Sequence, residues 1–145
     1  MRIAVMGEDS ANFCDEARRL LALEYVELCR PSDGADALLL LDREWSGPTE
    51  APVAIVRGDA HGRVDASVAI SYGMSPRDTL TVSGVTLDGL ALSVQREFFT
   101  LDGRRVVIQE LTLDWSLQPD RALPIAALGL IVGELGESVY AASSE

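Results

Sequence analysis

Lysine is absent from this sequence, and all 12 of its basic residues are arginine. A chain without lysine cannot carry a Walker-type phosphate loop, a Schiff-base lysine or a carbamylated lysine. Histidine occurs once, as His61, in a run of turn-forming residues, so a catalytic triad or a multi-histidine metal site would depend on one loop residue. These absences exclude several enzyme mechanisms, and we expect a protein without catalytic activity and without a resident cofactor.

Cysteine and long apolar segments are also scarce. The two cysteines, Cys14 and Cys29, have no metal-ligand spacing, and we expect both to be reduced. The longest apolar stretch, 123–135, is broken by proline and glycine and is too short to cross a hydrocarbon layer of ~30 Å. The first residues lack the apolar length and cleavage site of a signal peptide. We therefore expect a cytoplasmic protein that does not enter a membrane.

Basic charge is the third shortage, because 23 acidic residues give the chain a net charge of −11. A surface of that sign repels phosphate backbones and anionic lipid headgroups. We therefore expect no nucleic acid and no membrane among its partners, and instead a protein partner or a small-molecule ligand. The sequence leaves the oligomeric state open, and a homodimer is compatible with it.

The first half of the chain, 1–78, has the pattern of a parallel sheet. Continuous runs of valine, isoleucine and leucine are typical of strands that are covered on both faces. Between the first two runs, apolar residues recur at helical spacing and predict a helix that begins at Asp9 or Ser10. The buried stripe of this helix is Phe13, Cys14, Ala17, Leu20 and Leu21, and the predicted strands are 2–6, 25–29, 35–41, 52–56 and 66–71.

The second half, 79–145, changes to an alternating pattern. Two Asp-Gly pairs, at 88–89 and 102–103, lie where hairpin turns with positive φ are expected. They separate segments 81–87, 90–100 and 104–113, which we interpret as an antiparallel β-meander. A final helix over 123–135 is predicted, with Pro124 in its first turn and Gly136 as its C-cap. The fold prediction is a single α/β domain over 1–145, with a mainly parallel sheet, flanking helices and a meander in its second half.

Candidate binding residues follow the predicted strands. In a parallel sheet, ligands gather at the carboxyl ends of the strands, so the residues directly after each strand are the first to consider. The first loop has one glycine where a dinucleotide-binding loop needs three, and its acids would repel a pyrophosphate. The residues chosen on this basis as ligand-binding are Glu8, Asp42, Asp59, Tyr72, Gly73 and Arg77.

Three acids at the ends of the first and third strands suggest a weak metal site. Glu8, Asp9 and Asp42 present hard carboxylate oxygens, which are the ligands that Mg²⁺ prefers. This arrangement resembles the receiver domains of response regulators, in which a phosphorylatable aspartate ends the third strand. The receiver lysine is missing here, and without its positive charge we do not expect Asp42 to act as an effective phosphoacceptor.

Four short motifs in the order of the chain carry a second resemblance. They are Val53-Ala54-Ile55-Val56-Arg57-Gly58-Asp59, Ala69-Ile70-Ser71-Tyr72-Gly73-Met74, Glu110-Leu111-Thr112-Leu113, and Ala126-Ala127-Leu128-Gly129-Leu130 with Gly136. Together they resemble the back half of the central ATP-binding domain of Mur ligases. The resemblance implies a parallel sheet, a small antiparallel sheet and a packed final helix. It also implies that this chain is a reduced relative, because the phosphate loop with its lysine is missing.

The sequence therefore supports two hypotheses of function. The first is a non-catalytic, Mur-ligase-like domain that binds a protein or a small ligand at its strand-end loops. The alternative is a magnesium-dependent, receiver-like phospho-switch or small enzyme that uses Glu8, Asp9 and Asp42. Since the chain has no phosphate loop and no lysine, we expect neither binding nor hydrolysis of ATP under the first hypothesis.

Overall fold

The computed structural model describes residues 1–29, 34–45, 49–62, 64–135 and 139–140. Within this part of the chain there are two helices, α1 (Ser10–Leu20) and α2 (Pro119–Ile131). Neither helix is long and apolar enough to cross a membrane. The strands are β1 (Arg2–Met6), β2 (Glu27–Cys29), β3 (Ala37–Leu40), β4 (Thr49–Glu50), β5 (Val53–Arg57), β6 (Val64–Asp65), β7 (Val68–Gly73), β8 (Leu80–Thr86), β9 (Gly89–Val94), β10 (Phe98–Phe99), β11 (Arg105–Val106) and β12 (Gln109–Leu113).

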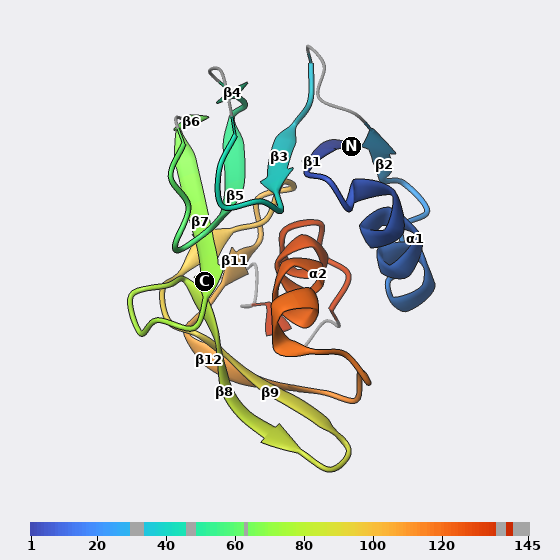
Figure 1. Cartoon of the computed structure of the whole chain (residues 1–145), viewed down its shortest axis with the longest axis vertical. Helices are drawn as coiled ribbons and strands as arrows, with labels where there is room; N and C mark the ends of the chain where they lie inside the picture. The colour runs from blue at the N-terminus through green and yellow to red at the C-terminus, as the bar shows by residue number, and fades with distance from the viewer. Residues whose placement is uncertain (30–33, 46–48, 63, 136–138, 141–145) are drawn as a thin grey trace.

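One mixed sheet of eight strands organises the fold (Figure 1). Its order is β12-β9-β8-β7-β5-β3-β1-β2, and every pairing from β2 across to β8 is parallel. The pairings of β8 with β9 and of β9 with β12 are antiparallel, which makes the last three strands a meander. The prediction of an α/β fold with a parallel first half and an antiparallel second half is confirmed at this level.

Both helices pack on the same face of the sheet. Inward-facing residues of the strands, including Ile3, Leu39 and Ile55, form one hydrophobic cluster with Phe13 of α1 and with nearly all of α2. A separate, smaller cluster on the other face contains Leu38, Leu40 and Ala51 and is covered by Trp45 and the β4–β6 ribbon. The sheet is thus covered on both faces, by the two flanking helices on one face and by Trp45 and the β4–β6 ribbon on the other.

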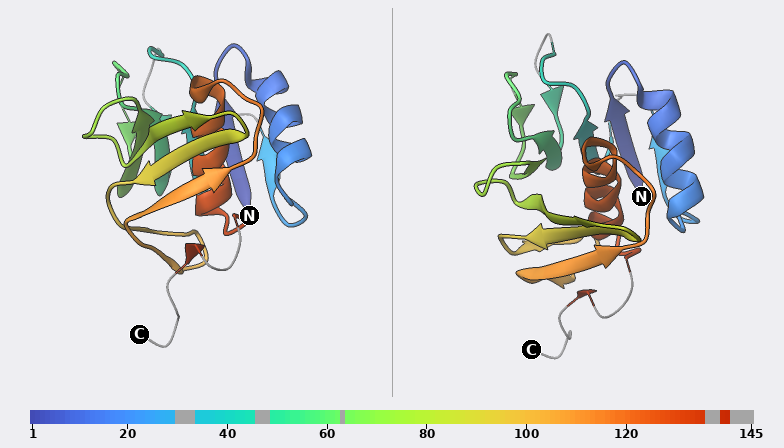
Figure 2. Two further views of the ribbon diagram at one scale, coloured as in Figure 1. Left: turned by 90° about the horizontal axis from the view of Figure 1, so that it is seen from below. Right: turned by 60° about the horizontal axis from the view of Figure 1, so that its bottom comes forward.

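Helix α2 is the centre of the core. Ten consecutive residues, from Ala122 to Ile131, are buried, and the helix contacts β5, β7, β8 and α1. The views in Figure 2 show the antiparallel strands passing along one side of α2 while α1 flanks another. A helix surrounded in this way is apolar all round rather than amphipathic. It joins the two halves of the chain, since β5 and β7 come from 1–78 and β8 from 79–145.

The ends of both helices differ from the prediction. Helix α2 begins at Pro119, so the favourable proline at its start is Pro119, and Pro124 lies inside the helix. It ends at Ile131 and is followed by Gly133 with φ of +81°, whereas the predicted cap Gly136 lies outside the described residues. Helix α1 begins at Ser10 as predicted, but Leu20 of its expected buried stripe is exposed on the last turn.

The predicted long meander strands are interrupted. Strand β9 ends at Val94, and the residues beyond it form a separate ribbon in which Phe98 pairs with Val106. Both of these side chains are buried in the main cluster. The break comes directly after Gln95, whose backbone N–H donates to the carbonyl of Thr79 and whose side-chain amide donates to that of Asp78, both at 2.8 Å.

The two Asp-Gly pairs have different roles. Gly103 has φ of +90° and makes the expected turn. In the other hairpin the turn residues are Leu87 and Asp88, because Thr86 pairs directly with Gly89. Gly89 is a strand residue there without positive φ, and a Cβ on it would lie 1.9 Å from the carbonyl oxygen of Leu113. Close approach of strand β12 therefore requires this glycine, and the expectation of a positive-φ turn at 88–89 is wrong.

Candidate functional site

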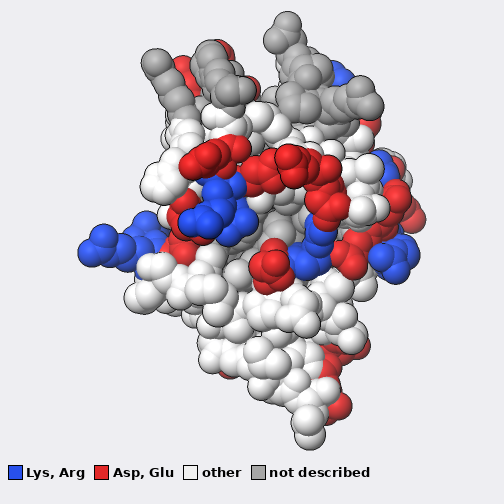
Figure 3. Space-filling view, viewed as in Figure 1, with Lys and Arg blue, Asp and Glu red and all other residues white. Residues whose placement is uncertain are grey.

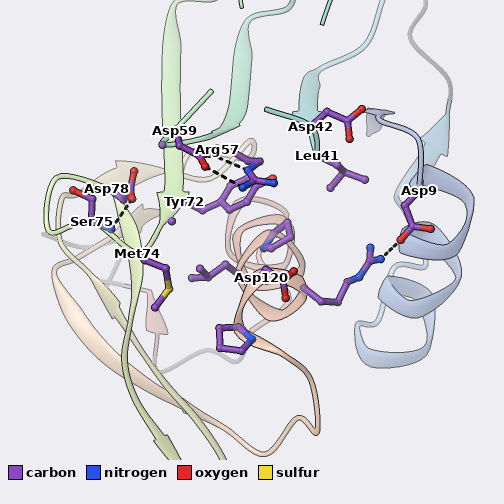
Figure 4. A pocket seen from close by; sticks show the side chains of 16 residues that line it. Asp9, Leu41, Asp42, Arg57, Asp59, Tyr72, Met74, Ser75, Asp78 and Asp120 are labelled. Atoms are coloured by element: carbon purple, nitrogen blue, oxygen red, sulfur yellow. Dashed lines mark hydrogen bonds and ion pairs between the residues drawn. The ribbon is translucent and has the colours of Figure 1, made fainter. Parts of the chain in front are cut away.

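A pocket of about 740 Å³ opens at the carboxyl ends of the parallel strands (Figures 3 and 4). Strand β1 leads through α1 to β2 on one side, whereas β3 lies on the other side, so the strand order reverses between β1 and β3. Crevices at such reversal points are the usual ligand sites of open α/β sheets. The lining residues are Asp9, Leu41, Asp42, Arg57, Gly58, Asp59, Tyr72, Gly73, Met74, Ser75, Asp78, Pro119, Asp120, Arg121, Leu123 and Pro124.

Apolar side chains form part of this lining. Leu41 follows β3, Met74 follows β7, and Leu123 and Pro124 come from the first turns of α2. Figure 4 shows Leu41 and Met74 on different sides of the cavity. Met74 is 69% exposed, although methionine is usually buried in a core. An exposed, flexible thioether at the edge of a pocket can adapt to the apolar part of a ligand.

The pair of Arg57 and Asp59 lies at the end of β5. Arg57 donates from Nε and Nη2 to the two carboxylate oxygens of Asp59, both at 3.0 Å. Arg43 adds a second cation, with its Nε 3.2 Å from Oδ2 of Asp59. The hydrogen bonds within the pair lower the pKa of Asp59 and raise the pKa of Arg57. The pair is therefore ionised on both sides at neutral pH.

A second ion pair joins the two helices across the pocket. Arg121 on α2 contacts the carboxylate of Asp9 through Nη2 and that of Glu16 through Nε at 3.3 Å. Asn12 also donates to Asp9, at 2.8 Å. The Arg121 hydrogen bond, followed by that of Asn12, lowers the pKa of Asp9. Asp9 precedes α1 as predicted, but its side chain makes no capping bond to the helix backbone.

Asp78 shapes the loop that forms one wall. It is only 4% exposed, and its Oδ2 accepts the backbone N–H of Ser75 at 3.1 Å, which holds the turn after β7 (Figure 4). Its carboxylate lies against two glycines: a Cβ on Gly58 would be 1.8 Å from Oδ1, and one on Gly73 would be 2.5 Å from Oδ2. The glycines at the ends of β5 and β7 are therefore required by a buried aspartate.

The structure brings together four of the six binding residues chosen from the sequence. The pocket is lined by Asp42, Asp59, Tyr72 and Gly73. Glu8 lines a neighbouring hollow, together with Arg43, Glu44 and His61. Arg77 lines a third hollow, on the far side of β5 and β7. Tyr72 is a buried wall residue, because its hydroxyl donates to the carbonyl of Leu40 at 2.8 Å. Burial raises its pKa above the ordinary range for tyrosine.

The proposed magnesium ligands do not converge. The backbone N–H of Glu8 donates to Asp42 at 3.2 Å, but Asp9 is engaged by Arg121 and Asn12. Among the described residues, no three histidine, cysteine, aspartate or glutamate side chains are grouped so that they could hold a metal ion. Metal binding at Glu8, Asp9 and Asp42 has no geometric support here and stays an untested prediction.

The lining residues that come from the start of α2 could not be predicted from local sequence patterns. Arg57 lies two residues before Asp59 at the end of a buried strand. A charged residue at the end of such a strand is a sequence signal for a binding residue, so Arg57 could have been predicted. Pro119, Asp120 and Arg121 come from a helix some 60 residues further along the chain. Nothing in their local sequence indicates that the start of this helix faces the ends of the parallel strands.

Comparisons of the chain with protein-family models, with curated proteins and with solved structures found no match. The chemistry of the site must therefore be inferred from its position, volume and charge. Of these, the charge is the most informative, because five aspartates and two arginines surround one cavity.

The Arg57–Asp59 pair should respond to acid in a defined direction. Because the folded protein holds the pKa of Asp59 below the value in an unfolded chain, the pair's contribution to stability is complete above about pH 5 and disappears as the pH falls through the folded-state pKa. Both side chains are partly exposed, so this contribution is at most ~1 kcal/mol. Carboxyl ¹³C titration should show the midpoint of Asp59 rising in Arg57→Gln. The control is Arg96→Gln, at an exposed residue outside the pocket lining, and an unchanged midpoint in Arg57→Gln would refute the assignment.

Proposed function

We propose that this protein is a non-catalytic domain that binds a small molecule in the strand-end pocket. The observation that carries the proposal is the pocket itself, which combines a reversal point of the sheet, a volume within the ~300–1,000 Å³ of ligand sites, and a mixed apolar and charged lining. A concave cavity of this size suits a small ligand better than the flat surface of a protein.

The absence of catalysis is supported by how the polar residues are used. Arg57 and Arg121 are bound to carboxylates, Asp78 holds a loop, and Tyr72 is bonded to a backbone carbonyl. His61 lines the neighbouring hollow instead of this pocket. If the motif resemblance reflects descent, the protein is a reduced relative of the central domain of Mur ligases that kept the strand-end crevice. The motif segments 53–59 and 69–74 supply Asp59, Tyr72, Gly73 and Met74 to the pocket.

One observation favours the receiver-like alternative. The first five main strands are ordered β2-β1-β3-β5-β7, and Asp42 follows β3 by two residues, beside the end of β1. Receiver-like doubly wound sheets have this order. However, Asp9, one of the three acids expected to bind magnesium, is held by Arg121. A phosphoryl adduct of ~80 Da formed with acetyl phosphate and Mg²⁺, and lost in Asp42→Asn, would establish the alternative.

The binding proposal predicts which amides respond to small probes. We expect ¹H–¹⁵N spectra to change on addition of at least one of 2-phenylethylamine, 2-phenylethanol and 3-phenylpropionate, which share a ring but differ in charge. The affected amides should be those of segments 41–42, 57–59, 72–75 and 120–121, which line the pocket. The amides of Asp102 to Arg104, at a turn remote from these segments in the sequence and absent from the lining, serve as the internal control.

Two results would count against the proposal. If none of the three probes shifts the pocket amides at millimolar concentration, the cavity is not a site for this class of small molecule. If the shifts scatter over the surface and include the control turn as strongly as the pocket, the probes bind non-specifically. A localised response to any one of the three supports the pocket as a ligand site, whatever the charge of the probe.

A further inference from the structure

Resting on the proposed function, we infer that the ligand of this pocket is a small organic cation, an amine or amidine joined to an apolar group. The cavity is lined by five aspartates against two arginines. Figure 3 shows the acidic side chains curving around the hollow on this face, with basic groups beside them. Charges of one sign along a concave, low-dielectric wall raise the local concentration of ligands of the opposite sign.

Both arginines of the lining are already paired with carboxylates of this chain. Arg57 donates from Nε and Nη2 to the two carboxylate oxygens of Asp59, which makes a bidentate ion pair. Arg121 contacts Asp9 through Nη2 and Glu16 through Nε. To bind Nε or Nη2 of either arginine, an anionic ligand would have to displace a carboxylate of this chain, and at Arg57 that carboxylate is held by two hydrogen bonds. It would also enter a cavity whose remaining charges are negative, and both effects oppose its binding.

The start of α2 does not offset the excess of negative charge in the pocket, although helix N-termini commonly bind anions. Pro119 is the first helical residue and has no N–H, and the N–H groups of Arg121 and Ala122 both donate to the carbonyl of Gln118, at 3.0 and 2.9 Å. Pro124 also lacks an N–H, so the carbonyl of Asp120 receives no bond from the i+4 position. The start of the helix therefore offers few free N–H groups to an anion.

Two carboxylates remain to receive a cation. The carboxylate of Asp120, at the start of α2, has no hydrogen bond or salt bridge to a described residue, and its charge is one of those that raise the pKa of Arg57. Within the described part of the chain, the carboxylate of Asp42, after β3, accepts one hydrogen bond, from the backbone N–H of Glu8. Figure 4 shows them on different elements around the same cavity, with Met74 and Leu41 nearby for an apolar group. A charged nitrogen between these acids would form charge-assisted hydrogen bonds and relieve the repulsion between them.

Titration with the same three probes tests which sign of charge the pocket prefers in its ligand. We expect 2-phenylethylamine to bind about tenfold more tightly than the neutral 2-phenylethanol, and 3-phenylpropionate to bind most weakly. Affinity for the amine should fall as salt is added, since its attraction is electrostatic. Asp120→Asn, which removes a charge and keeps the shape, should weaken the amine about threefold to tenfold and leave the alcohol unchanged.

The matched control is Asp114→Asn, which removes the same charge from an exposed residue outside the lining. It should leave the affinity for the amine within about twofold of wild type. Pocket shifts with the alcohol or the carboxylate that equal or exceed those with the amine would overturn the cation while leaving the ligand site intact. No pocket response to any probe would overturn both.

Discussion

Replacing Gly58 with alanine should lower the melting temperature by about 6–12 °C. The added Cβ would lie 1.8 Å from Oδ1 and 2.6 Å from Cγ of Asp78, well inside van der Waals contact. Asp78 has little room to withdraw, because it is buried and its Oδ2 is bonded to Ser75 and close to Gly73. Overpacking of a buried site, with the loss of a hydrogen bond to a buried charge, costs about 2–4 kcal/mol, or ~3 °C per kcal/mol in a chain of this size.

Gly84→Ala is the matched control for this prediction. A Cβ at Gly84 would meet nothing within 4 Å, and its φ is not positive, so we expect a change below ~0.5 kcal/mol. The double variant Gly58→Ala with Asp78→Ala should be less destabilised than the sum of the two single variants, because the second change removes the clash. Thermal and urea unfolding of the four variants and the wild type measure these differences. Equal melting temperatures for Gly58→Ala and Gly84→Ala would show that the contact with Asp78 is not tight.

The isolated segment 1–78 should fail to fold. In the full chain, the inward faces of β1, β3, β5 and β7 pack in one cluster with α2, which comes from 119–131. Removing the second half exposes that face, including Ile3, Leu39, Ile55 and Ile70, and leaves α1 as its only helical cover. A segment of this size with one uncovered sheet face cannot bury enough apolar surface to offset the loss of conformational entropy.

Circular dichroism and amide dispersion distinguish the outcomes. The segment 1–78 should show no cooperative thermal transition and narrow amide dispersion, whereas chain 1–140, which retains α2 and the meander, should unfold in one transition. A sharp and reversible transition in 1–78 would instead establish the parallel half as an independent domain.

The parts of the fold that are determined by local pattern could be predicted. Strand β1, helix α1 and the buried strands β3 and β5 were recognisable because their apolar residues follow one period without interruption. The ends of α2 were not, because Pro119 and Pro124 both fit the start of a helix, and only packing decides between them. The sequence of the meander likewise did not show that Phe98 and Val106 leave the sheet to fill the core.

The candidate site was only half predictable for a related reason. The rule that ligands bind at the carboxyl ends of parallel strands selected Asp42, Asp59, Tyr72 and Gly73, all of which line the pocket. It also selected Glu8 and Arg77, which follow strands but face other hollows, because the rule gives the edge of the sheet and not the direction of each side chain. Arg121 and Asp120 depend on where α2 docks, which is a property of the whole core.

The most direct test of the central claim is to locate a bound probe by intermolecular nuclear Overhauser effects. With ¹³C-labelled protein and unlabelled 2-phenylethylamine, the ring protons should show contacts to the methyl groups of Met74, Leu41 and Leu123, which line the pocket. Apolar probes that bind non-specifically would instead find exposed side chains elsewhere, and Leu87 and Tyr25 are the most accessible large apolar side chains among the described residues outside the pocket lining. Contacts to the pocket methyls are the result that we predict, and contacts confined to Leu87 and Tyr25 would contradict the account.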